Sequence, residues 1–156
     1  MIRFSWRSDS EEQTVRFGAV LGRALEGPAW LGLIGPLGAG KTRLVQGLAQ
    51  GLGYEGRVRS PSFVLEHRYR GRRPILHLDL YRLEGPGADL EADWEEETEA
   101  VVLVEWAERV HAPPPGALLL RLEPLSESQR RIELSWEPGS GAIRVLRLEA
   151  LRGAGP

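Results

Sequence analysis

Gly35-Pro36-Leu37-Gly38-Ala39-Gly40-Lys41-Thr42 is the stretch that says most about the fold of this 156-residue chain. It fits G-x-x-x-x-G-K-[ST], a loop between a strand and a helix whose backbone N–H groups cradle phosphate oxygens. In this pattern the lysine reaches the β- and γ-phosphates of a nucleotide, and the hydroxyl ligates Mg²⁺. The predicted nucleotide-binding residues of the loop are Gly35, Leu37, Gly38, Ala39, Gly40, Lys41 and Thr42.

Lys41 is the only lysine of the chain, and every other residue among the 20 lysines and arginines is an arginine. A compact ammonium on a flexible stem fits beside phosphates in a way that the planar fork of arginine does not. A chain that otherwise uses arginine has therefore kept a lysine at the one position where this loop requires it.

The residues on both sides of the loop favour the same interpretation. The apolar run from Trp30 to Ile34 is typical of a strand buried on both faces. After the loop, apolar residues recur at helical spacing from Leu44 to Leu52, with Gly51 and Gly53 as a stop signal. A glycine-rich turn with a chance Lys-Thr is the alternative, and this strand–loop–helix context argues against it.

Length and composition limit the remaining choices. A chain of this length indicates a single domain, residues 1–156, with 152–156 predicted to be frayed. A net charge of −2 and a pI near 6.0 do not indicate nucleic-acid binding through bulk charge. The absence of cysteine excludes disulfides and zinc–thiolate sites. No apolar run has membrane-spanning length and no signal-peptide pattern is visible, so we expect a cytoplasmic protein without a membrane partner.

Hydrophobic patterning predicts the other elements. A capping box formed by Ser8 and Glu11 is expected to begin a helix that ends at Gly27-Pro28. The acidic stretch Asp89–Thr98 is predicted to be helical. The predicted strands are Ile2–Trp6, Phe63–Tyr69, Pro74–Leu80, Val101–Val104, Leu118–Leu122 and Ile132–Trp136. The second and third of these are predicted to form a hairpin around Arg70-Gly71-Arg72-Arg73. These elements predict an α/β fold, a P-loop NTPase with a mixed, mainly parallel sheet flanked by helices and with late antiparallel strands.

Two carboxylates are candidates for metal chemistry. Asp79 shares one face of its predicted strand with His77 and Tyr81, and a solvent-facing aspartate is an equal alternative from spacing alone. Glu105 follows four apolar residues, at the end of the strand where ligands bind in open α/β sheets. The predicted metal ligands are Thr42 with Asp79 or Glu105, and the sequence leaves open which carboxylate binds Mg²⁺ and which orients water. The predicted catalytic residues are Lys41, Asp79 and Glu105.

Three further features each allow two interpretations. Ser60-Pro61-Ser62-Phe63 follows the P-loop helix and is either a switch that senses the γ-phosphate or a plain Ser/Pro turn. Spacing favours a core role for Trp106, with a place beside the nucleotide as the alternative. Arginines at 68, 70, 72 and 73 and acids at 95, 96, 97 and 99 form local patches, each either solvated or facing a partner such as RNA or a protein.

Four segments in order resemble the TsaE (YjeE) family of small bacterial ATPases. They are the loop 35–42, Ser60-Pro61-Ser62-Phe63, His77-Leu78-Asp79-Leu80-Tyr81-Arg82-Leu83 and Val104-Glu105-Trp106-Ala107-Glu108. The H-x-D-L-Y-R-L string with a downstream Glu-Trp is far more specific than the loop alone. The resemblance covers residues 2 to about 122. The family usually has threonine where this chain has Ser62, and serine keeps the hydroxyl.

The resemblance implies a function and a set of site residues. It implies that Asp79, Glu105 and Trp106 act with the P-loop, with Trp106 among the nucleotide-binding residues and Ser60–Phe63 as the switch. The cofactors would be ATP or ADP and Mg²⁺. Such proteins are needed for the N6-threonylcarbamoyladenosine modification of tRNA. The ATP cycle would reset a complex of the TsaD and TsaB proteins, so tRNA would be reached only through that complex.

Two other functions share the same loop. A small-molecule kinase needs a substrate pocket and usually an arginine-rich lid, whereas the region after Glu105 is short and proline-rich. A GTP switch would read guanine with Asn-Lys-x-Asp. This chain has no asparagine and no lysine beyond Lys41, which excludes that motif.

Overall fold

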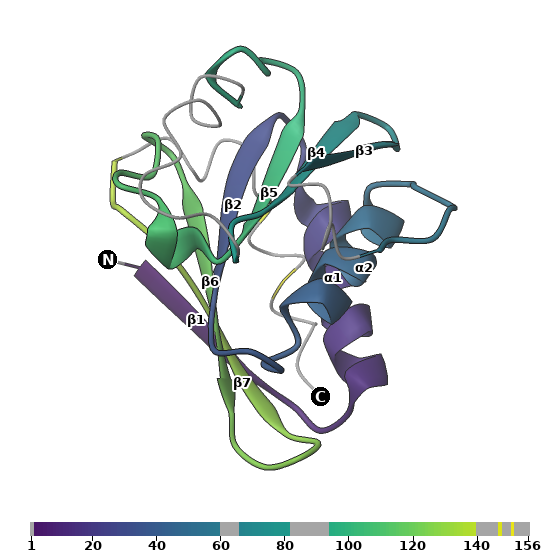
Figure 1. The fold of residues 1–156 in the computed structure, drawn as a ribbon, viewed down its shortest axis with the longest axis vertical. Helices are drawn as coiled ribbons and strands as arrows, with labels where there is room; N and C mark the ends of the chain where they lie inside the picture. The colour runs from purple at the N-terminus through teal and green to yellow at the C-terminus, as the bar shows by residue number, and fades with distance from the viewer. Residues whose placement is uncertain (1, 60–65, 82–93, 140–146, 148–150, 152–156) are drawn as a thin grey trace.

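A single seven-stranded sheet organises the structure, with two helices packed on one of its faces (Figure 1). The computed structural model describes residues 2–59, 66–81, 94–139, 147 and 151. The strands are β1 (Ile2–Ser8), β2 (Ala29–Ile34), β3 (Glu66–Arg70), β4 (Pro74–Asp79), β5 (Val101–Glu105), β6 (Leu118–Pro124) and β7 (Arg130–Trp136). The helices are α1 (Glu11–Ala24) and α2 (Lys41–Gly51), and a 3-10 turn, η1 (Ala107–Arg109), follows β5.

The sheet is mixed, with parallel strands at its centre, as predicted. Its order is β1-β7-β6-β2-β5-β4-β3. Strand β2 pairs in parallel with β5 and β6, and β4 pairs in parallel with β5. The predicted hairpin β3–β4 and the late pair β6–β7 are antiparallel, as is β1–β7. Because β2, β4 and β5 are parallel, their carboxyl ends meet at one edge, where ligands bind in sheets of this kind.

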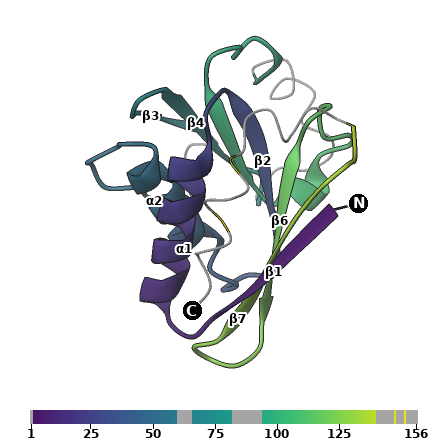
Figure 2. The same cartoon turned by 180° about the vertical axis from the view of Figure 1, so that it is seen from behind.

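The main hydrophobic core lies between the sheet and the helices α1 and α2, which Figure 2 shows on the same side of the sheet. The two helices approach closely because glycines face one another at their contact. A Cβ atom on Gly18 of α1 would lie 2.6 Å from the carbonyl oxygen of Leu44 in α2. A smaller cluster around Trp30 and Trp94 covers the opposite face. Residues on β4 and β5 therefore alternate between two buried environments.

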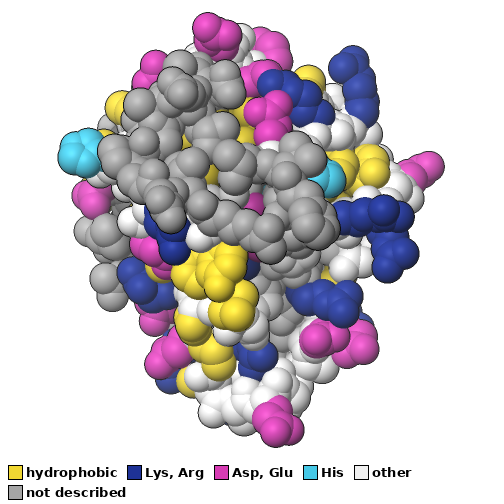
Figure 3. Space-filling model, viewed as in Figure 1, with side chains coloured by type: hydrophobic (Ala, Val, Ile, Leu, Met, Phe, Trp, Pro, Cys, Tyr) yellow, Lys and Arg dark blue, Asp and Glu magenta, His cyan; other side chains and the backbone are white. Residues whose placement is uncertain are grey.

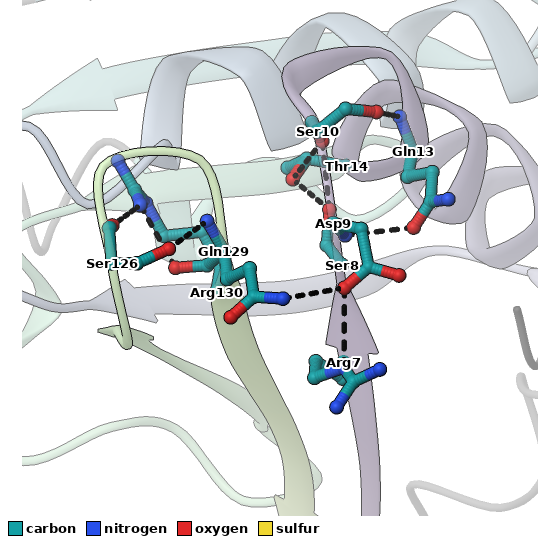
Figure 4. Close-up of polar contacts among 9 residues, drawn as sticks. All are labelled: Arg7, Ser8, Asp9, Ser10, Gln13, Thr14, Ser126, Gln129 and Arg130. Carbon is teal, nitrogen blue, oxygen red and sulfur yellow. Dashed lines mark hydrogen bonds and ion pairs between the residues drawn. The ribbon is translucent and has the colours of Figure 1, made fainter.

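Helix α1 begins two residues later than its predicted capping box. Ser10 is the N-cap, and its hydroxyl accepts from the backbone N–H of Gln13 at 3.1 Å (Figure 4). The Gln13 side chain accepts in turn from the N–H of Asp9. Ser8 is instead the last residue of β1, buried with its hydroxyl 2.7 Å from that of Thr14. The prediction failed because two serines precede the helix and Gln13 completes the box for the second of them.

The two charged patches pair with each other in part. Arg68 forms an ion pair with Glu97, and Arg73 lies 3.5 Å from Glu99. Figure 3 shows basic and acidic side chains interspersed on this side of the molecule. Of the stretch predicted to be helical at 89–98, positions 94–98 are described, and only 94 and 95 are helical. The predicted helix is therefore not continued through 98, and Glu97 and Glu99 instead pair with arginines of the β3–β4 hairpin.

No helix in the described part of the chain is both long enough and apolar enough to cross a bilayer. The predicted switch, Ser60–Phe63, and the predicted frayed end, 152–156, lie outside the described residues.

Candidate nucleotide-binding site

The loop between β2 and α2 has the backbone of a phosphate-binding loop. Gly38 and Gly40 have φ angles of +79° and +100°, which side-chain-bearing residues rarely adopt. The N–H of Ala39 donates to the carbonyl of Pro36 at 3.1 Å and closes the turn. Gly40 caps α2 without any side-chain hydrogen bond. The first N–H groups of α2 have no intrahelical acceptor, and this leaves them to an anion.

Lys41 is the first residue of α2, and its side chain folds back over the loop. Its ammonium donates to the carbonyl oxygens of Gly35 and of Pro36, the latter at 2.9 Å. The same ammonium lies 3.8 Å from the centre of the Trp106 ring, a cation–π distance. Lys41 is 5% exposed. The cation is therefore held within the loop by neutral acceptors.

Burial lowers the pKa of Lys41, because leaving water disfavours the charged form. The negative charges of Glu108, Glu105 and Asp79 oppose this shift. The three carboxylates thus act on the ammonium through their charges, while its hydrogen bonds go to the carbonyls of Gly35 and Pro36. An anion at the loop would supply the compensation that the carbonyls alone do not.

Thr42 and Glu105 are joined directly. The Thr42 hydroxyl donates to Oε1 of Glu105 at 2.9 Å. Glu105 ends β5 and is 2% exposed, and all five residues of that strand are buried. The structure therefore brings together two of the predicted metal ligands, one from the helix and one from the neighbouring strand.

Asp79 lies beside Glu105 but makes different contacts. The two residues are register partners at the ends of β4 and β5. Oδ1 of Asp79 accepts from the backbone N–H of Tyr81 at 2.9 Å, and its charge acts on Lys41. The structure thus places Glu105 on the Thr42 hydroxyl, while Asp79 is half-buried at the adjacent strand end.

The donor set fits Mg²⁺ bound together with a nucleotide. No group of three or more His, Cys, Asp or Glu residues within the described ranges could hold a metal by itself. Mg²⁺ in nucleotide sites takes one or two protein oxygens and completes its shell with phosphate oxygens and water. The Thr42 hydroxyl and one carboxylate satisfy that requirement.

Trp106 is part of the site as well as of the small core cluster. Spacing favoured a core role, yet the half-buried ring also faces Lys41 and lies 5.0 Å from that of Tyr81. Among the described residues it is the only non-glycine with positive φ, at +61°. Such backbone strain persists only where the surroundings impose it, and it concentrates at functional sites.

Sequence reasoning missed three contributors to this site. The Nε2 atom of His77 lies 2.6 Å from Oε2 of Glu105. Glu108 accepts from the N–H of Gly35 at 3.3 Å. Arg130, at the start of β7, donates to the carbonyls of Ala39 and Gly38 at 3.1 and 3.0 Å and braces the loop from outside. His77 and Glu108 were visible as members of the quoted motifs, whereas no local signal marks Arg130.

The parallel core, the glycine-rich loop and the strand-end acids define a P-loop α/β domain. Residues 8–132 match the family model described as "Threonylcarbamoyl adenosine biosynthesis protein TsaE". The chain therefore belongs to the TsaE family.

Individual relatives agree with this assignment. A tRNA threonylcarbamoyladenosine biosynthesis protein TsaE from a Nostoc species is 40% identical and covers 80% of this chain and 81% of its own. The protein of the same name from Treponema pallidum is 37% identical, covering 82% and 97%. Among solved structures, a crystal structure titled as that of Bacillus subtilis YdiB matches with a TM-score of 0.72. That match has 26% identity and covers 97% of this chain and 95% of the other.

Proposed function

We propose that this protein is a Mg²⁺-dependent ATPase that serves as an accessory component in the threonylcarbamoyladenosine modification of tRNA. The observation that carries the proposal is the Thr42–Glu105 hydrogen bond beside Lys41, at the N-terminus of α2. It joins a phosphate-binding loop to a strand-end carboxylate, which is the arrangement that nucleotide hydrolysis needs. The names of the relatives supply the pathway.

The residues divide the chemistry by position. The loop N–H groups of residues 38–42 would bind the phosphate oxygens, and Lys41 would move from the loop carbonyls to the β- and γ-phosphates. Thr42 and Glu105 would hold Mg²⁺, which supplies charge neutralisation at the transferred phosphoryl group. Asp79, the register partner of Glu105 at the adjacent strand end, would orient the attacking water. No covalent intermediate with the protein is required.

A two-part measurement tests the activity. Turnover and affinity are measured with ATP, with GTP and with ATP plus a panel of small acceptors. We expect slow Mg²⁺-dependent release of phosphate from ATP and no phosphorylated acceptor. Transfer to an acceptor would replace the ATPase with a small-molecule kinase, and the absence of binding to any nucleotide would overturn the proposal.

The proposed partners are the TsaD and TsaB proteins, with tRNA engaged only through their complex. A ligand biases association only if the protein has different partner affinities in the two ligand states. Capture of the TsaD–TsaB pair is therefore compared in ATP, in ADP and without nucleotide. We expect capture to differ between ATP and ADP. Equal capture in all three conditions, or none, would argue against a nucleotide-gated accessory role.

A further inference from the structure

A buried hydrogen-bond chain continues from Glu105 away from the nucleotide loop. Oε1 of Glu105 accepts from Thr42, and Oε2 lies 2.6 Å from Nε2 of His77. His77 is fully buried, at 0% exposure. Its Nδ1 lies 3.3 Å from the hydroxyl of Tyr69, which in turn donates to the carbonyl of Arg59 at 3.3 Å. This hydrogen-bond chain begins in the loop after α2 and passes through one side chain each of β3, β4 and β5. It ends at the first turn of α2.

The donors and acceptors of this hydrogen-bond chain can be assigned by counting the hydrogens that each group carries. A carboxylate only accepts, so Nε2 of His77 carries the hydrogen shared with Glu105. In the neutral ring Nδ1 is then an acceptor and needs a donor. Burial raises the pKa of Tyr69, so its phenol keeps its hydrogen. The phenol has one hydrogen, which can go to Nδ1 or to the carbonyl of Arg59 but not to both at once. The alignment described below has this hydrogen on the bond to Nδ1.

The contact between His77 and Glu105 restrains the orientation of the Glu105 carboxylate. Glu105 could rotate about its last side-chain bond if Thr42 were the only partner of its carboxylate. The bond from His77 holds the second oxygen, and this fixes the plane in which the first oxygen meets the Thr42 hydroxyl. Partners that orient a metal ligand in this way typically change metal affinity or activity by about 10- to 100-fold when removed.

We infer that His77 is a positioning residue, which with Tyr69 aligns the Glu105 carboxylate on Thr42 for nucleotide-bound Mg²⁺. The inference rests on the proposed ATPase function. It adds a residue pair on β3 and β4 that does not itself touch the nucleotide.

Two substitutions at His77 separate its two contacts. In His77→Gln the amide nitrogen reaches the place of Nε2 and can still donate to Glu105. In His77→Asn the shorter amide reaches only the place of Nδ1, so the carboxylate loses its partner. Tyr69→Phe leaves the bond between His77 and Glu105 in place and removes only the hydroxyl beside Nδ1. His67→Gln is the matched control, because His67 lies directly opposite His77 in the β3–β4 register and is not part of the hydrogen-bond chain.

The expected pattern is a split between kcat and binding. His77→Asn should lower kcat by about 10- to 100-fold and raise the Mg²⁺ concentration for half-maximal turnover. Its affinity for ADP without Mg²⁺ should stay at the wild-type value. His77→Gln should recover most of the loss, Tyr69→Phe should show a smaller loss, and His67→Gln none. Wild-type kcat in His77→Asn, or equal loss in both His77 variants, would overturn the inference.

A spectroscopic readout keeps the test independent of turnover. The ring ¹⁵N shifts of His77 should show hydrogen on Nε2, and Tyr69→Phe should move the Nδ1 shift while His67→Gln does not. Hydrogen on Nδ1 alone would refute the chain as described. If the wild-type protein fails to hydrolyse ATP while these shifts are as expected, the ATPase proposal fails and the inferred alignment does not.

Discussion

The two ends of α2 each hold a basic side chain that donates to backbone carbonyls, in opposite electrostatic settings. At the C-terminal end, Arg72 donates to Gly51 at 2.6 Å and to Gly22 and Leu25, at the end of α1, at 3.0 and 3.1 Å. The negative ends of two helix dipoles favour a cation there. At the N-terminal end Lys41 meets the positive end of the dipole.

The difference separates a structural contact from a binding site. Arg72 donates to the carbonyls of Gly51 and Leu25 and adds a second donor to the carbonyl of Gly22, which also accepts from the N–H of Leu25. Lys41 is buried where both the helix dipole and desolvation disfavour its charge, and burial lowers its pKa. In the proposed function an anion bound at the loop would offset this cost. Helix α1 makes the same point, because it begins with a serine cap and two glutamates, whereas α2 begins with a glycine cap and a lysine.

The largest expected effect comes from Lys41→Ala. Loss of the ammonium removes the charge that would meet the β- and γ-phosphates, so ATP hydrolysis should fall by about 100-fold or more. Phosphate release measured at saturating ATP checks this, with circular dichroism to confirm folding. Arg43→Ala is the control, because Arg43 lies on the exposed side of the same turn in an ion pair with Glu11. Wild-type turnover in folded Lys41→Ala protein would show that α2 has no phosphate site.

The two carboxylates should differ in their dependence on Mg²⁺. If Glu105 holds Mg²⁺ as proposed, Glu105→Gln should cost about 10- to 100-fold in kcat, with a clear rise in the Mg²⁺ requirement. Asp79→Asn should lower kcat with little change in that requirement, because the Thr42 hydroxyl and the Glu105 carboxylate that it contacts are both kept in this variant. Mg²⁺ titrations of turnover for both variants check the division. The reverse pattern would make Asp79 the metal ligand.

Arg72→Ala tests the structural end of α2. It removes the side-chain donor from the carbonyls of Gly51, Gly22 and Leu25, of which Gly22 still accepts from the N–H of Leu25. The free energy of unfolding should fall by about 1–2 kcal/mol. Urea unfolding measures this, and turnover of the folded variant should match the wild type. Arg70→Ala, an exposed arginine of the same hairpin, provides the control and should change little. A large loss of activity with unchanged stability would contradict the division of roles between the two ends.

The parts of the fold that the sequence predicted are those encoded by neighbouring residues. The apolar run before Gly35, the helical spacing after Thr42 and the hairpin around Gly71 each fall within a short window. The Glu105 position was predictable for the same reason, since an acid that ends a buried strand lies at the ligand-binding edge. Local patterns thus account for the strand–loop–helix unit β2–α2, for the β3–β4 hairpin and for the position of Glu105 at the end of β5.

The contacts that could not be predicted from the sequence depend on which strands pair and in what register. Asp79 and His77 were equivalent by spacing, and only the β4–β5 pairing brings the His77 ring onto Glu105. Arg72 and Arg130 act through backbone carbonyls, and any residue can supply a carbonyl, so no partner type marks them in the sequence. The positive φ of Trp106 likewise has no signature in the residue type.

The smallest expected effect is on the thermal stability of the ligand-free protein. It tests the comparison between Lys41 and Arg72 most sharply. Because the folded-state pKa of Lys41 is lowered, its charge opposes folding at neutral pH, and this cost disappears as pH rises above the ordinary lysine pKa. Lys41→Met keeps the stem and removes the charge, so it should leave the melting temperature unchanged or slightly raised at pH 7. That sign is opposite to Arg72→Ala.

Melting curves between pH 7 and pH 10 provide the check. The difference between Lys41→Met and the wild type should shrink as pH rises, because the wild-type lysine loses its proton more readily in the folded state than in the unfolded state. Adding ADP should reverse the order at pH 7, since only the wild type gains from an anion beside Lys41. A Lys41→Met protein that is markedly destabilised without ligand would mean that the bonds to Gly35 and Pro36 outweigh burial. Lys41 would then resemble Arg72, and its contacts would stabilise the fold.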